Sequence, residues 1–160
     1  MFKSVSITLL VLVTLIVSGP GETAAQHGGH GGGSTHEMNI PTQDVLVEGI
    51  VVGFSVMENA NHRKMLKNMK MKDDIEPGTT HNVMITLKDQ KTQHPITDAS
   101  LGVRVVDPSG KDQIKTMKFE PSMSSYDAYF KMPDKGKYQI LVLVRKEDQK
   151  MTAGIHYDVH

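Results

Sequence analysis

Apolar and polar residues alternate along most of the chain after residue 44. In the segment 81–88, one strand face carries the odd positions, which are His81, Val83, Ile85 and Leu87. A period of two is typical of a strand that buries one face in an antiparallel sheet. Residues 101–105 and 151–159 repeat this alternation. Residues 138–145 are nearly apolar on both faces, which predicts a central strand.

Turn signals separate these segments at short and regular intervals. Asp107-Pro-Ser-Gly110 is a typical hairpin turn, and 133–136 and 147–150 are further turns. Residues 45–56 read as one long strand bent at its glycines, and residues 113–119 as another. We therefore predict an all-β fold, an immunoglobulin-like antiparallel β-sandwich of about seven strands. A closed barrel is the structural alternative.

One segment departs from the strand pattern. Between residues 58 and 70, apolar and imidazole side chains recur at the i, i+3, i+4 and i+7 spacing of a helix face; these are His62, Met65, Leu66 and Met69. The lysines and the arginine of the segment fall elsewhere on the helix. The sequence thus predicts one short helical insert in the sandwich.

The N-terminal 25 residues have the pattern of a secretory signal. A single early lysine, Lys3, precedes an apolar run of 13 residues from Val5 to Val17, and small residues follow at 23–25. Because a membrane-spanning helix needs about 20 apolar residues, a retained anchor is the less favoured alternative. We expect a periplasmic or otherwise extracytoplasmic protein.

Residues 26–44 form a glycine-rich segment that we expect to be a disordered tail, because glycine is entropically costly to order. Histidine-rich tracts of this kind are a compositional signal of metal binding. The possible accessory ligands are His27, His30, His36 and Met38. A flexible polar linker is the alternative interpretation. The sandwich domain is then expected over residues 45–160.

Composition excludes several classes of function. The 18 basic residues balance the 18 acidic ones, so the sequence predicts neither nucleic-acid binding nor strong binding to a membrane surface. Cysteine is absent, so the domain has no disulfides and no thiolate ligands for zinc. No nucleophile, metalloprotease or phosphate-loop motif occurs, and we expect a protein that is not an enzyme.

Methionine carries the remaining chemical signal, with 11 residues in a chain of 160. Thioether and imidazole ligands suit Cu(I) best among biological metals. Candidates concentrate between residues 57 and 84: His62, Met65 and Met69 on the helix face, completed by Met71, His81 or Met84. The alternative is that these methionines fill gaps in the core.

Three segments resemble the YtkA-like family of small exported β-sandwich domains: 101–110 (LGVRVVDPSG), 126–133 (YDAYFKMP) and 136–144 (GKYQILVLV). The resemblance implies an extracytoplasmic domain near copper handling or respiratory-oxidase assembly, with a fold similar to CopC-type copper carriers. Many relatives carry Met-Pro-x-Met followed by His in one loop. Here that loop reads Phe119-Glu-Pro-Ser-Met-Ser and keeps only Met123, so the insert at 57–71 would have to supply the other ligands.

These observations leave two hypotheses. The first is an exported protein that binds a soft metal, copper as Cu(I) above others, and carries or buffers it through the His/Met-rich site. The second is a non-catalytic interaction module whose Met-rich helix docks on a membrane partner such as an efflux or oxidase-assembly complex, because methionine-rich surfaces adapt to varied partners.

Overall fold

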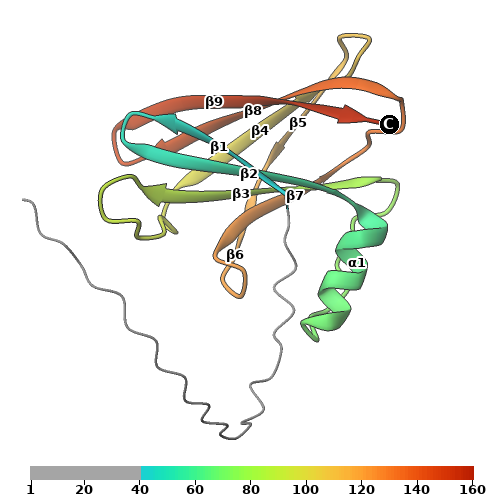
Figure 1. Ribbon diagram of the computed structural model, residues 1–160, viewed down its shortest axis with the longest axis horizontal. Helices are drawn as coiled ribbons and strands as arrows, with labels where there is room; N and C mark the ends of the chain where they lie inside the picture. The colour runs from blue at the N-terminus through green and yellow to red at the C-terminus, as the bar shows by residue number, and fades with distance from the viewer. Residues whose placement is uncertain (1–40) are drawn as a thin grey trace, which may run out of the picture. The chain divides into compact units, whose positions relative to one another are not determined.

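The computed structural model describes residues 41–160, which form two antiparallel sheets and one helix (Figure 1). The five-stranded sheet has the order β1-β2-β3-β7-β6 and the four-stranded sheet the order β5-β4-β8-β9. The elements are β1 Thr42–Val47, β2 Ile50–Glu58, α1 Asn59–Asn68, β3 His81–Asp89, β4 Ser100–Val106, β5 Asp112–Thr116, β6 Lys118–Glu120, β7 Ser125–Phe130, β8 Gly136–Lys146 and β9 Gln149–Val159. The predicted all-β antiparallel sandwich is confirmed.

The number of strands differs from the expected seven because two predicted strands are each divided. Residues 45–56 belong to a hairpin, in which Glu48 and Gly49 both have positive φ, 48° and 80°, and reverse the chain. Positive φ at both central residues is the geometry of the two-residue turn that best fits strand twist. Residues 113–119 divide at Met117, where the chain passes from the four-stranded sheet to the five-stranded one.

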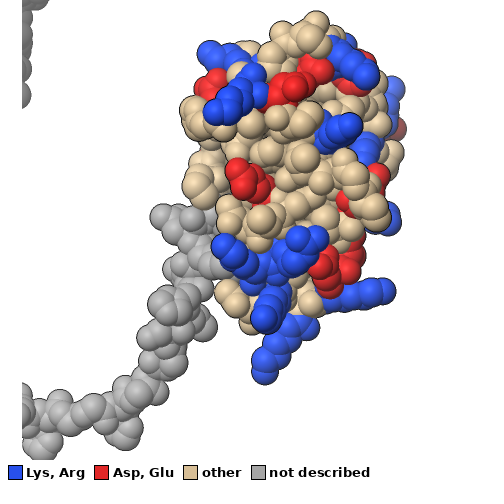
Figure 2. All heavy atoms as spheres, turned by 90° about the vertical axis from the view of Figure 1, so that its right-hand side faces the viewer, with Lys and Arg blue, Asp and Glu red and all other residues tan. Residues whose placement is uncertain are grey.

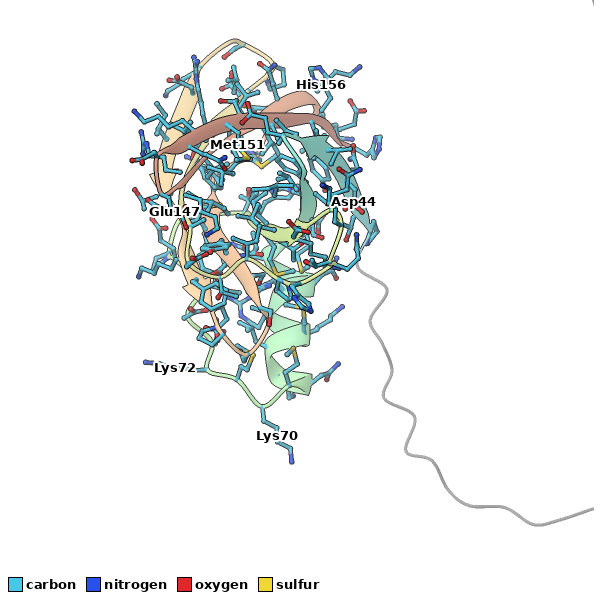
Figure 3. The ribbon with its side chains drawn as sticks, turned by 90° about the vertical axis from the view of Figure 1, so that its left-hand side faces the viewer. Asp44, Lys70, Lys72, Glu147, Met151 and His156 are labelled. Carbon is cyan, nitrogen blue, oxygen red and sulfur yellow. The ribbon has the colours of Figure 1, made fainter. Side chains whose placement is uncertain are left out.

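The core fills the space between the sheets. Met151, labelled in Figure 3, lies there, and so does Met117, whose N–H donates to the carbonyl of Leu101. The largest fully buried side chains come from strands of both sheets and from Met132 just after β7; the strand residues include Phe54, Phe130, Ile85, Leu87, Leu101, Tyr138 and Ile140. The predicted inward face of β9 is confirmed at Met151, Ala153 and Ile155.

Helix α1 lies within the predicted segment 58–70 and buries His62, Met65 and Leu66. It ends in a Schellman motif: Lys70 takes a left-handed conformation with φ 56°, its N–H donates to the carbonyl of Lys67, and the N–H of Met71 donates to that of Leu66. The motif folds the chain back over the helix end, so Met71 returns to the side of Leu66. Within residues 41–160, no helix has the length and apolarity to cross a membrane.

Candidate metal centre

The outer face of the five-stranded sheet provides the platform for the site. In β7, Phe130 points into the core and pairs with His81 of β3, so the alternate residues Tyr129 and Asp127 face outward beside Asn82 and Met84. Helix α1 follows β2 directly and brings its buried side over this face, where the ring of His62 meets that of Tyr129 edge to face at 5.6 Å.

A chain of hydrogen bonds fixes the protonation of His62. The Tyr129 hydroxyl donates to Asp74 Oδ1 at 2.8 Å and lies 3.0 Å from Nε2 of His62. A phenol has one proton, and here the carboxylate accepts it, so Nε2 must be the donor to the Tyr129 oxygen. The neutral imidazole therefore carries its proton on Nε2, and Nδ1 keeps a free lone pair.

That lone pair lies in an unusual environment. His62 has no solvent exposure, and its Nδ1 is buried without a hydrogen-bond partner in the described part of the chain. An unpaired buried polar atom costs about 1–3 kcal/mol. Burial lowers the pKa of His62, against the raising effect of Asp74 and Asp73, so the ring stays neutral. A neutral imidazole nitrogen is the form that binds metals.

His62 lines a hollow of about 340 Å³ between the end of α1 and the turn that joins β6 to β7. Two methionines reach it from separate loops. Met71 comes from the Schellman motif, and Met123 from the β6–β7 turn, where its N–H donates to the carbonyl of Glu120 at 3.2 Å. Both are partly buried. The full lining is His62, Leu66, Met71, Lys72, Asp74, Glu120, Ser122, Met123 and Asp127.

Three carboxylates line the hollow, those of Asp74, Glu120 and Asp127. Burial raises the pKa of Asp127, and the charges of Asp74 and Glu120 raise it further, while a hydrogen bond from Asn82 and the charge of Lys118 lower it. Burial, with the nearby Asp74 and Asp127, also raises the pKa of Tyr129, so its hydroxyl remains protonated. Negative charge held together in this way favours the entry of a cation.

Ser122 of the β6–β7 turn lies next to Met71 of the other loop of the hollow. Its hydroxyl lies 2.5 Å from Glu120 Oε1 and 3.5 Å from the sulfur of Met71. Since a hydroxyl has one proton, the shorter contact takes it, and the sulfur of Met71 keeps its lone pairs. In residues 41–160, no group of three or more His, Cys, Asp or Glu side chains is arranged to hold a metal ion. A metal in this hollow would therefore have to use the thioethers.

Only some of the metal ligands predicted from the sequence line the hollow. His62 and Met71 line the hollow, and Met65 is buried on the same helix without lining it. Met69 is 43% exposed, and Met84 is buried on the outer sheet face but is absent from the lining. The accessory candidates His27, His30, His36 and Met38 lie outside the described residues.

His81 lies on the opposite face of β3 from Met84. Its ring packs against Tyr157 of the other sheet, with centroids 6.0 Å apart, and Thr80 Oγ1 is 2.9 Å from its Nδ1. The Thr80 hydroxyl also accepts from the N–H of Met132. Burial lowers the pKa of His81, against the raising effect of Glu58. His81 thus belongs to the end of the inter-sheet core, and the five-stranded sheet stands between it and the hollow.

Sequence reasoning did not assign the carboxylates Asp74, Glu120 and Asp127 to the site. They come together through the pairing of β7 with β3 and β6, which has no local signal. Met123 had a signal, because the sequence comparison with the YtkA-like family had already singled out the loop 119–124 that contains it.

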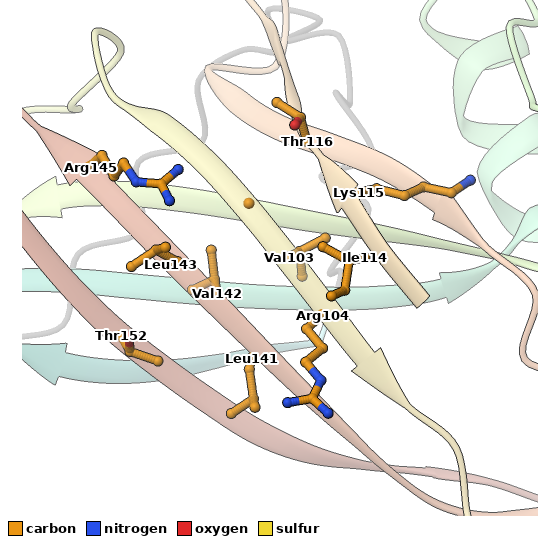
Figure 4. Close-up of a pocket in the computed structure, with 11 residues that line it drawn as sticks. Val103, Arg104, Ile114, Lys115, Thr116, Leu141, Val142, Leu143, Arg145 and Thr152 are labelled. Carbon is orange, nitrogen blue, oxygen red and sulfur yellow. The ribbon is translucent and has the colours of Figure 1, made fainter. Parts of the chain in front are cut away.

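A larger hollow, of about 440 Å³, lies on the outer face of the four-stranded sheet (Figure 4). Ile114, Leu141 and Leu143 give it an apolar surface, and Arg104 and Arg145 border it. Arg104 pairs with Asp112 at 2.7 Å. Its lining includes no histidine, methionine or carboxylate, so its chemistry does not suit a metal.

Comparison with known proteins finds similarity in structure alone. No family model and no curated protein sequence matches the chain. FetP of uropathogenic Escherichia coli, expressed in the periplasm, superposes with a TM-score of 0.57 and 10% identity over 76% of this chain and 97% of FetP. A copper-bound single-residue variant of FetP gives 0.54 and 11%, over 72% and 93% of the two chains.

A DUF4426 family protein from Pseudomonas aeruginosa gives a TM-score of 0.54 at 10% identity, covering 74% of this chain and 94% of that protein. At these identities the likeness establishes the fold alone. The chain therefore shares its β-sandwich with FetP and with the DUF4426 protein.

Proposed function

We propose that this protein is an extracytoplasmic, non-catalytic copper-binding protein that carries or buffers Cu(I) in the hollow beside α1. The observation that carries the proposal is that His62, whose Nδ1 is buried and unpaired, lines the same hollow as Met71 and Met123. One imidazole and two thioethers form a soft ligand set that suits Cu(I), whereas Zn(II) prefers thiolate, more nitrogen or oxygen.

The surroundings of the three ligands support this assignment. Asp127 and Glu120 would attract and partly neutralise a cation, and Tyr129 and Asp74 would hold the imidazole in the tautomer that presents Nδ1. The copper-bound FetP variant has a similar fold, which makes copper a reasonable ion for this sandwich. Membership of the YtkA-like family is part of the same proposal.

Competition with a chromogenic Cu(I) chelator under reducing conditions tests the proposal. We expect one tight site in the wild-type protein. Replacing Met71 and Met123 by Leu removes both sulfurs from the hollow at nearly constant volume, and we expect binding to weaken more than tenfold. Replacing Met65 and Met69 by Leu is the matched control, because neither residue lines the hollow.

Equal affinity in the two double variants would refute the site. The histidines of the tail are tested separately: changing His27, His30 and His36 to Gln is expected to lower the number of weakly bound ions and to leave the tight site intact. This result would fit an accessory role, in which a tethered tail raises the local metal concentration.

A second candidate function rests on Met69. Its 43% exposure leaves an apolar side chain at the end of α1, where it could contact a protein partner such as a membrane efflux or oxidase-assembly complex. A protein that binds no copper but loses a partner when Met69 is changed to Gln would favour this interaction module.

A further inference from the structure

The end of α1 and the residues after it form a strongly basic surface, which we call the lysine tip: Lys64, Lys67, Lys70 and Lys72, with Met69 among them. All five side chains are exposed. Figure 2 shows basic side chains gathered at the lower end of the molecule, and Figure 3 shows Lys70 and Lys72 projecting from the same end. The chain is neutral as a whole, but its charges are unevenly placed.

The lysines of the tip form no ion pairs within residues 41–160, although Lys72 also lines the hollow with three carboxylates. Arg63, on the same helix, pairs with Asp73 at 2.7 Å, and Asp74 accepts the hydroxyl of Tyr129. The other ion pairs in residues 41–160 use Arg104, Lys115 and Lys146. None of them involves a lysine of the tip, so four positive charges face solvent together.

The shape of the tip indicates what it can bind. It is the projecting end of a helix, so its surface is convex, and only at Lys72 does it border the hollow beside α1. Lysine is depleted at protein–protein interfaces, where arginine and aromatic residues dominate. Lysine can instead lay its aliphatic stem along apolar material and keep its ammonium at a polar boundary. Met69 adds one exposed apolar side chain at the centre.

We propose that the lysine tip binds the surface of an anionic phospholipid membrane, with Met69 directed into the headgroup region. Each lysine near such a surface strengthens binding by about fivefold at ordinary ionic strength. Lys72 belongs both to the tip and to the lining of the hollow, so docking would hold the mouth of the hollow close to the membrane. Membrane binding by these exposed charges does not require the hollow to bind copper.

The test is co-sedimentation of the exported protein with vesicles of phosphatidylglycerol and phosphatidylcholine, or of phosphatidylcholine alone. We expect binding to the mixed vesicles alone, with release at 1 M salt, where the Debye length falls to about 3 Å. Changing the four tip lysines to Gln should weaken binding by roughly 600-fold, about fivefold for each lysine. Changing them to Arg keeps the charge and should preserve it.

The matched control removes the same charge elsewhere, at the exposed Lys88, Lys91, Lys135 and Lys150. This variant should bind the mixed vesicles clearly better than the tip variant. Equal loss in both would overturn the proposal, because net charge alone would then explain binding. Soluble polyglutamate that binds the tip as tightly as the vesicles do would also overturn it, in favour of an acidic protein partner.

Discussion

The hydroxyl of Tyr129 lies 3.0 Å from Nε2 of His62 and bridges it to Asp74, which accepts the tyrosine proton at 2.8 Å. This relationship links β7, the helix α1 and the loop after it. It selects one imidazole tautomer and orients the ring, which is how a residue outside the ligand set tunes a metal site.

Replacing Tyr129 with Phe removes the oxygen that accepts from Nε2 of His62. We expect Cu(I) affinity to fall by about 10–100-fold, the usual effect of losing a partner that orients a ligand. The free energy of unfolding should fall by about 1–3 kcal/mol, because a buried N–H loses its acceptor. Chelator competition measures the first, and urea denaturation the second.

Nitrogen NMR of the His62 ring in the metal-free protein reports its tautomer. It therefore distinguishes a loss of ring orientation in Tyr129→Phe from a loss of stability alone. Wild type should show a bare Nδ1, and Tyr129→Phe a mixture of tautomers. Asp74→Asn is the conservative control, because its amide oxygen can still accept the tyrosine proton. A wild-type ring protonated at Nδ1 would contradict the hydrogen-bond assignment even if copper binds tightly.

Stability should depend on pH through His62 and His81, whose pKa values are both lowered from 6.5, chiefly by burial. The unfolded chain then binds protons more readily than the folded one, so folding stability is complete above about pH 6.5 and falls as the pH drops toward the folded pKa values. Urea denaturation between pH 7.5 and about 5 checks this. His81→Gln should flatten the slope, because it removes one of the two buried rings.

Asp127→Asn is expected to raise the stability of the protein and to lower its affinity for Cu(I). Burial and the charges of Asp74 and Glu120 raise the pKa of Asp127, so its ionised form is unfavourable in the metal-free fold. The variant should be more stable near pH 7 by roughly 0.5 kcal/mol, the scale of one interaction between partly exposed charges. Its Cu(I) affinity should fall, because the hollow loses a negative charge. A variant that is both less stable and unchanged in affinity would contradict this account.

The alternation along β3 shows which features of the fold and the site could be predicted from the sequence. Period two correctly predicted a strand with Val83, Ile85 and Leu87 inside, and the same pattern puts His81 and Met84 on opposite faces. His81 and Met84 could therefore not both contribute ligands to one site on the helix side of the sheet. The helix spacing correctly placed His62 and Met65 on the buried face of α1.

Other parts of the site depend on long-range pairing. Asp127 reaches the hollow because β7 pairs with β3 in a register that sets it beside Met84, and no local pattern encodes that register. The strand break at Met117 was missed for a related reason: residues on both sides have strand character, and only tertiary packing shows that they belong to different sheets. Met71 was predicted as a ligand without the Schellman turn that brings it back to the helix.

The Schellman turn after α1 should be stabilised by glycine at position 70. Lys70 adopts φ 56°, a left-handed conformation that costs a residue with a Cβ about 1–2 kcal/mol and costs glycine nothing. Lys70→Gly should therefore stabilise the protein by about 0.5–1 kcal/mol after the greater freedom of glycine in the unfolded chain is subtracted. Lys70→Ala keeps the unfavourable conformation and removes the same charge, so it should leave stability almost unchanged. Because the Schellman hydrogen bonds place Met71, Lys70→Gly should also retain full Cu(I) affinity, measured by the same chelator competition. A loss of affinity in Lys70→Gly but not in Lys70→Ala would mean that the left-handed turn does not position Met71.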